Sequence, residues 1–180
     1  IGRAVDAQKR LPSLMELLGK YVSDPQVAVA ANDDFGYTTG PIQISDFESD
    51  IRVDEHIRNI WLTGAGGGND GESYDLILYA AGRKVVLDSV EKRGKKGYLF
   101  MYADEPIFPE VKVNEVKAVF GDTIEKNIPI AEIIEEAMRP EVMQGADDAA
   151  RILRRFGIRV DNTGKRIFVA NHHPTLNDIM

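Results

Sequence analysis

The residues best suited to bind something lie in the stretch Trp61–Asp75, where oxygen-bearing side chains accompany closely spaced glycines. The candidate oxygens belong to Asn69, Asp70, Glu72 and Ser73. Glycine has no Cβ, so its backbone adopts conformations that other residues avoid and approaches neighbouring groups closely. The stretch therefore predicts a loop that gathers side-chain oxygens and backbone groups around a small ligand. Its glycines are Gly64, Gly66, Gly67, Gly68 and Gly71.

The spacing within this loop argues against two common phosphate sites. No Gly-Lys-Ser/Thr triplet follows the glycines, as a P-loop requires. The loop also does not follow a strand with Gly-x-Gly-x-x-Gly spacing, which weakens a dinucleotide site. A tight connection between two helices is the structural alternative, although five glycines exceed what a turn requires. We therefore favour a binding role for the loop.

A second group of oxygens follows the clearest strand of the chain, the apolar run Tyr98–Ala103. Such a run is typical of a parallel strand that is covered on both faces. Asp104 and Glu105 come directly after it, and ligands of open α/β sheets bind beyond the carboxyl ends of the strands. We expect Asp104 to lie near the glycine loop. His172 and His173 point in different directions in any regular backbone and are interpreted as surface residues.

Composition excludes several classes of function. The 180 residues carry a net charge of −7, which argues against a general nucleic-acid surface or an anionic membrane surface. No apolar run reaches about 18 residues, so no membrane span is expected. The chain has no cysteine and three histidines, which removes disulfides and thiolate sites and disfavours a zinc site. A cytoplasmic, reducing compartment fits this composition.

Hydrophobic periodicity predicts helices that alternate with strands. A helix capped by Ser45 or Asp46 is expected to carry Val53, Ile57 and Trp61 on one face. Alternation of this kind indicates an α/β fold with a doubly wound, mostly parallel open sheet and helices on both faces. The expected helices cover residues 3–22, 45–61, 74–85, 113–120 and 128–138, and the expected strands cover 26–31, 41–45 and 98–103.

Charge changes near Pro140, which suggests a boundary. From Glu141 onward six basic residues face five acidic ones, whereas the preceding part is strongly acidic. We predict an α/β domain over residues 1–140 and a small helix–hairpin–helix module over residues 141–180, with a hairpin between 158 and 170. Arg151, Arg154 and Arg155 lie on the helix of that module and suggest docking on a partner protein.

Three stretches together resemble a von Willebrand factor A-type domain, closest to bacterial and phage members of that family. They are Phe47–Asp50, Gly66–Tyr74, and Arg93–Phe100 with its continuation to Asp104 and Glu105. The similarity spans roughly residues 1–140. It implies a Rossmann-like sheet and a divalent cation, usually Mg²⁺, in a metal-ion-dependent adhesion site. Hard oxygen ligands from separate loops suit this cation.

The resemblance assigns particular residues to the metal site. Asp104 matches the aspartate of the third loop. Asn69 stands where the second loop has a threonine, and Ser73 is a nearby hydroxyl. The first motif, Asp-x-Ser-x-Ser, is absent, and it would precede Ile1 together with the first strand; the final sheet strand is also missing between Met138 and Gly145.

The expected function is non-enzymatic binding of a partner protein in a multiprotein assembly, where an acidic residue of the partner completes the cation's coordination. Family members often work beside AAA+ ATPases. One alternative is an α/β enzyme or phosphoryl-ligand binder that uses the Gly64–Gly71 loop, with His56 or a carboxylate as base. The other is a structural subunit whose metal site is not functional. The partner-binding loop would comprise Gly66, Gly67, Gly68, Asp70, Glu72 and Glu105.

Overall fold

The chain forms two compact units, Ile1–Gly68 (unit 1) and Asn69–Met180 (unit 2). The computed structural model describes Lys9 and residues 15–64, 71–95, 97–103, 106–138 and 168–171. Within these ranges, no helix combines the length and the apolar character needed to cross a bilayer. Each unit is described by itself below.

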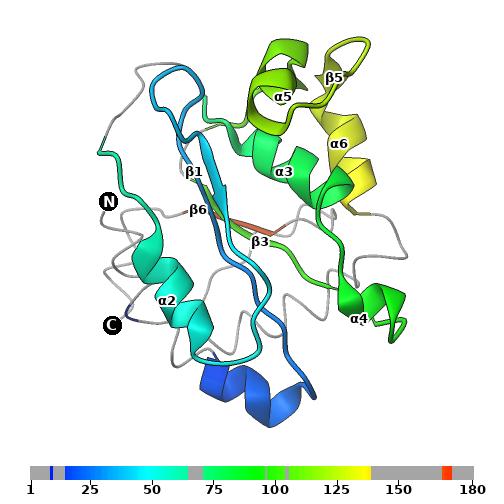
Figure 1. The fold of residues 1–180 in the computed structure, drawn as a ribbon. Helices are drawn as coiled ribbons and strands as arrows, with labels where there is room; N and C mark the ends of the chain where they lie inside the picture. Colours follow the sequence, from blue (N-terminus) through cyan, green and yellow to red (C-terminus); the bar gives the residue numbers. More distant parts are fainter. Residues whose placement is uncertain are drawn as a thin grey trace. The chain divides into compact units, whose positions relative to one another are not determined.

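Unit 1 is built on a β-hairpin and one amphipathic helix (Figure 1). Strand β1 (Ala30–Asn32) pairs antiparallel with β2 (Ile42–Ile44), so that Ala31 lies opposite Gln43. Helix α2 (Arg52–Asn59) buries Val53 and Ile57, which are four residues apart and therefore on one face. Residues 15–21 are also helical.

The start of α2 corrects the expected helix boundary. We expected Ser45 or Asp46 to cap a helix that included Trp61, but α2 begins at Arg52 and ends at Asn59. The capping oxygen is instead that of Asp50, whose Oδ1 accepts the backbone N–H of Arg52 at 3.0 Å. Ile60 leaves the helix with an extended backbone, at ψ 121°. Trp61 consequently lies beyond the helix and is exposed, rather than on its buried face.

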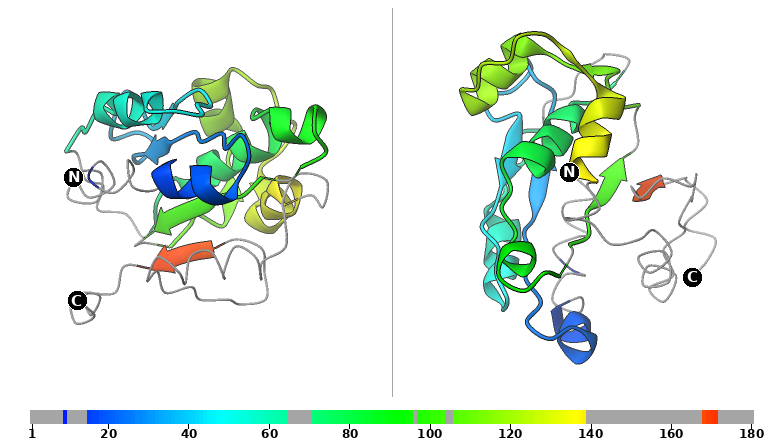
Figure 2. Two further views of the ribbon diagram at one scale, coloured as in Figure 1. Left: turned by 90° about the horizontal axis from the view of Figure 1, so that it is seen from below. Right: turned by 90° about the vertical axis from the view of Figure 1, so that its right-hand side faces the viewer.

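Unit 2 is centred on helix α3 (Tyr74–Arg83), which packs against α6 (Ile130–Ala137) in both views of Figure 2. The two helices approach closely at Gly82 of α3. A Cβ at this position would lie 3.2 Å from the backbone nitrogen of Ala137, which is tighter than an ordinary contact. Beside this contact, the Arg83 guanidinium binds the Glu136 carboxylate through two hydrogen bonds of 2.6 and 2.7 Å. The predicted start of a helix at Tyr74 is confirmed, as is the buried position of Ile133 and Ala137. The helix predicted over 128–138 begins only at Ile130, because Ile128 and Pro129 form strand β5.

The remaining elements of unit 2 are short. Helix α5 (Val113–Phe120) has the predicted limits and ends at Gly121, whose φ of +74° is the left-handed conformation that favours glycine at a helix end. The ring of Tyr79 in α3 packs against that of Phe120, with 5.1 Å between the ring centroids and a tilt of 31°. The Tyr79 hydroxyl donates a hydrogen bond to Asp122 at 2.7 Å. The other elements are α4 (Asp88–Glu91), β3 (Phe100–Ala103), β4 (Glu110–Val111), β5 (Ile128–Pro129) and β6 (Phe168–Asn171).

The predicted doubly wound parallel sheet is wrong. The described residues form three separate two-stranded sheets, of which β1–β2 and β4–β5 are antiparallel and only β3–β6 is parallel. The apolar runs at 26–31 and 98–103 yield strands of three and four residues. A nine-residue loop joins β1 to β2 and returns the chain antiparallel, whereas a parallel pair needs a longer crossover.

Residues 168–171 pair with β3 and not with a neighbouring strand of a hairpin among the described residues. In this pair, Phe100 lies opposite Phe168 and Ala103 opposite Asn171. The β3–β6 pair thus joins segments on either side of the predicted boundary at residue 140. That boundary itself stays a prediction.

Candidate functional site

Most of the residues that the sequence assigned to the metal and partner-binding loop lie outside the described ranges. These are Asp104, Asn69, Gly66, Gly67, Gly68, Asp70 and Glu105. Their assignment stays a prediction. The described part of the site runs from Gly71 to Asp75 and contains Glu72 and Ser73.

The end of the glycine loop is fixed by backbone packing against the segment after β3. The N–H of Glu72 donates to the carbonyl of Pro106 at 2.9 Å, and Glu72 forms a parallel β-bridge with Ile107. A Cβ at Gly71 would lie 3.0 Å from that carbonyl oxygen and 3.0 Å from the ring of Phe108. The glycine at position 71 therefore has a packing reason that is independent of any ligand.

Immediately after this contact, the chain enters α3 with two fully buried polar side chains. Ser73 and Asp75 are both 0% exposed. Ser73 is the residue before the helix, and its side chain makes no capping hydrogen bond. The apolar neighbours of Asp75 along the helix, Tyr74 and Leu76, are buried as well. A carboxyl group thus lies inside the apolar interior of unit 2.

Asp75 differs from the other buried carboxylates of the described chain, because neither of its oxygens accepts a hydrogen bond of normal geometry; only the adjacent backbone N–H groups of positions 75 and 76 lie close enough to favour its charged form. Asp54 uses one oxygen to bind Arg58, and Glu115 uses Oε1 to accept from Lys112 at 3.0 Å. Glu115 is 5% exposed and its Oε2 has no partner.

Burial and the nearby charge of Glu115 raise the pKa of Asp75 from 3.8 to about 7. The backbone N–H groups at positions 75 and 76 and the charge of Lys112 act in the opposite direction.

Two neighbouring carboxylates in an apolar interior require a positive partner or a proton. An unpaired buried carboxylate costs several kcal/mol, and two like charges increase that cost. Lys112 provides one positive charge, and its ammonium group pairs with Glu115 Oε1. The oxygens of Asp75 and Glu115 Oε2 remain available to a hard cation, which prefers carboxylate and hydroxyl ligands. The described residues contain no group of three or more His, Cys, Asp or Glu side chains placed to hold a metal ion.

The sequence analysis missed Asp75 and Glu115. Asp75 was included only as the end of the glycine-rich stretch, although it lies within the run Tyr74–Ala80 that α3 buries completely. The sequence did contain a signal for Asp75, namely a carboxylate within a helix that is buried on all sides. Glu115 gave a weaker signal, since it lies beside the buried Val116 in a helix with exposed polar residues.

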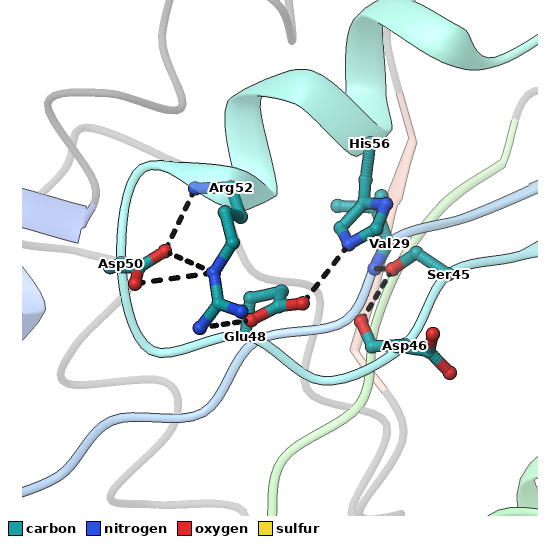
Figure 3. A network of polar contacts seen from close by, with 7 residues as sticks. All are labelled: Val29, Ser45, Asp46, Glu48, Asp50, Arg52 and His56. Atoms are coloured by element: carbon teal, nitrogen blue, oxygen red, sulfur yellow. Dashed lines mark hydrogen bonds and ion pairs between the residues drawn. The ribbon is translucent and has the colours of Figure 1, made fainter.

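Unit 1 contains a polar network that could be mistaken for a catalytic group (Figure 3). His56 Nε2 lies 3.4 Å from Glu48 Oε1, and the hydroxyl of Ser45 is nearby. The Ser45 hydroxyl, however, donates to the carbonyl of Asp46 at 2.8 Å and accepts the N–H of Val29 at 3.0 Å. Its proton is therefore directed to a backbone oxygen and not to the imidazole.

The remaining members of this network tie the β2–α2 connection to α2. Arg52 contacts Glu48 Oε2 at 2.8 Å and Asp50 Oδ1 at 3.0 Å. The hydrogen bond from Arg52 holds the pKa of Asp50 below its usual value. Glu48 is thus shared between His56 and Arg52 (Figure 3), which is the arrangement of a structural clamp.

Comparison with known proteins gives no relative on which to base a function: no family profile, curated protein or solved structure matches the chain. The functional argument consequently depends on the geometry described above.

Proposed function

We propose that the chain is a protein-binding module in which unit 2 holds a divalent cation, with Mg²⁺ as the first candidate. One observation carries the cation: Asp75 is fully buried and neither of its carboxylate oxygens accepts a hydrogen bond of normal geometry from the described residues. A bound cation would neutralise Asp75 and the neighbouring Glu115 together. That would remove the cost of placing two carboxylates in an apolar interior.

The available groups fit a hard cation. Mg²⁺ is commonly bound by one or two carboxylates and keeps several water ligands. Asp75 and Glu115 Oε2 would supply the carboxylate oxygens, and the fully buried Ser73 lies two residues before Asp75. Lys112 limits the charge of the site, because its ammonium group pairs with Glu115 Oε1 and leaves Oε2 for the cation.

The burial of Asp75 and Glu115 determines how a bound cation would act. A partner's carboxylate cannot reach groups with no solvent exposure, so the cation would act on the fold and not as a direct bridge. It would fix the start of α3 against Lys112 and Glu115, and with it the end of the glycine loop at Glu72. Partner binding in a multiprotein assembly, including one with an AAA+ ATPase, is then a property of surfaces that this site stabilises.

The proposal is tested by thermal unfolding of the full chain, first in chelator and then in excess Mg²⁺. Cation binding to the folded state at a hundred times the Kd stabilises by about 2.7 kcal/mol, which raises Tm by several degrees. Asp75→Asn and Glu115→Gln should each abolish this rise. The matched control is Glu132→Gln, which alters an exposed carboxylate of the same unit and should retain the rise.

Two outcomes overturn the cation site. One is an unchanged melting curve for the wild-type chain when chelator is replaced by Mg²⁺. The other is an equal rise in wild type and Asp75→Asn, which would place the cation elsewhere.

A further inference from the structure

The single tryptophan of the chain marks a second surface, in unit 1. Trp61 follows α2 in an extended segment, and 56% of its surface is exposed. Its backbone is nevertheless fixed at both polar groups. Gln43 Oε1 accepts the N–H of Trp61 at 2.9 Å, and Gln43 Nε2 donates to the carbonyl of Trp61 at 2.9 Å.

The indole ring lies against the loop that joins β1 to β2. A Cβ at Gly40 would lie 3.8 Å from two carbon atoms of the ring, which is ordinary van der Waals contact. The ring therefore covers the Gly40 backbone with one side. An exposed aromatic side chain with a fixed backbone loses little conformational entropy on binding, and tryptophan is enriched among the residues that dominate protein interfaces.

Other exposed apolar side chains belong to the same segments. Tyr37, in the β1–β2 loop, is 54% exposed, and Leu62, next to Trp61, is 37% exposed. The following residue, Thr63, donates a hydrogen bond to Asp33 at the end of β1, so the segment after Trp61 is anchored to the hairpin as well. We call Trp61 and Leu62, which are neighbours in the chain, the Trp61 surface.

The part of unit 1 that carries this surface is rich in acidic residues. Residues 15–64 contain nine Asp and Glu residues and only three Lys and Arg residues. All three cationic side chains are paired with carboxylates of the same unit: Lys20 with Glu16, Arg52 with Glu48 and Asp50, and Arg58 with Asp54. The three Lys and Arg side chains of residues 15–64 are thus already paired, and acidic residues outnumber basic ones in this range by six.

We infer that the Trp61 surface binds a basic segment of a partner protein, one that presents lysine or arginine together with an apolar side chain. The apolar side chain packs on the indole, and the cations are attracted by the carboxylates of unit 1. Arginine also stacks favourably on the exposed face of an indole. This inference rests on the proposed protein-binding role, but it does not depend on the cation in unit 2.

The test is a selection from a random peptide display library against the full chain, in low salt and with chelator present. The enriched peptides are then synthesised and titrated while the emission of Trp61, the only tryptophan, is recorded. We expect peptides rich in lysine, arginine and apolar residues, a blue shift of the emission on binding, and weaker binding in high salt.

Variants of two exposed residues locate the surface. Trp61→Ala, followed by anisotropy of labelled peptide, should weaken binding by about tenfold or more, as expected for a dominant interface residue. Ile51→Ala is the matched control, because Ile51 is 74% exposed in the same unit but outside the Trp61 surface; it should leave the affinity unchanged. Circular dichroism of both variants checks that unit 1 stays folded.

Several results would overturn the inference. They are failure to enrich any peptide, enrichment of peptides without excess positive charge, or equal binding by Trp61→Ala and wild type. The last result would leave a protein-binding role in place at another surface. Because the Mg²⁺-dependent rise in Tm is measured in unit 2 without any peptide, failure of the cation site is recognised separately.

Discussion

The side-chain amide of Gln43 contacts the backbone of Trp61 as a neighbouring strand would, with one hydrogen bond donated and one accepted, both of 2.9 Å. Gln43 lies in the middle of β2, and Trp61 lies in the extended segment after α2. One side chain thus attaches that segment to the hairpin without a regular strand pair. The exposed indole depends on this contact for its fixed position.

Gln43→Ala should therefore loosen Trp61 more than it destabilises the protein. Each lost hydrogen bond is worth about 1 kcal/mol at most, and partial exposure reduces that value. We expect a lower fluorescence anisotropy of Trp61, with a small decrease in Tm. Asn59→Ala, an exposed change at the end of α2, is the control. An anisotropy that is equal in Gln43→Ala and wild type would show that the amide does not restrain Trp61.

Gly71→Ala should destabilise unit 2. A Cβ at this position would approach the Pro106 carbonyl oxygen and the Phe108 ring to 3.0 Å, which requires backbone or ring displacement. Overpacking of this kind costs about 1–3 kcal/mol. Gly19→Ala is the control, because nothing lies within 4 Å of its Cβ position and the residue is helical. That change should raise stability by up to about 1 kcal/mol, and urea denaturation measures both effects.

The sequence predicted helices better than it predicted sheet topology, for a physical reason. Helix periodicity is local, so the apolar stripes of α3, α5 and α6 were recognisable within single segments. Strand pairing is not local. The partner of β3 is β6, and the sequence between them contains no signal that selects Phe168–Asn171 over other apolar runs. Alternation of helices and strands therefore predicted a single sheet that is not formed.

The candidate site was found in part. Ser73 lies directly before α3, at the end of the glycine loop, and its predicted role at a metal site stays a prediction. Asp75 and Glu115 were missed because each is a single polar residue on an apolar helix face. One such residue does not change the hydrophobic periodicity of the helix. Trp61 was predicted to lie on a buried face, because the predicted helix ended two residues later than α2 does. The predicted position of the helix end thus determined whether Trp61 was expected in the core or on the surface.

Leu76→Ala should separate the two units in an unfolding experiment. Leu76 is 0% exposed in the first turn of α3, and truncation of such a leucine costs about 2–5 kcal/mol. If the units unfold independently, only the transition of unit 2 moves, while the Trp61 fluorescence of unit 1 reports an unchanged transition. Val86→Ala, at a side chain that is 60% exposed, is the control in unit 2. Equal shifts in both transitions would contradict independent units.

Asp75 should make the stability of unit 2 decrease as pH rises, when chelator keeps cations away. Burial and Glu115 raise the pKa of Asp75 from 3.8 to about 7 in the folded state. Between pH 4 and 7, the folded state therefore keeps a proton that the unfolded state has already released. The free energy of unfolding then falls by up to about 1.4 kcal/mol per pH unit in this interval and levels off above it.

The comparison that isolates this effect is wild type against Asp75→Asn, by urea denaturation at several pH values from 4 to 8. As pH rises, Asp75→Asn should become more stable relative to wild type, because asparagine has no proton to lose. Glu115→Gln removes one of the two causes of the raised pKa, so its decrease should level off at a lower pH than in wild type and be smaller in total. A difference between wild type and Asp75→Asn that is constant across this range would mean that Asp75 does not titrate there. The cost of its burial would then be met by a partner that is present at every pH.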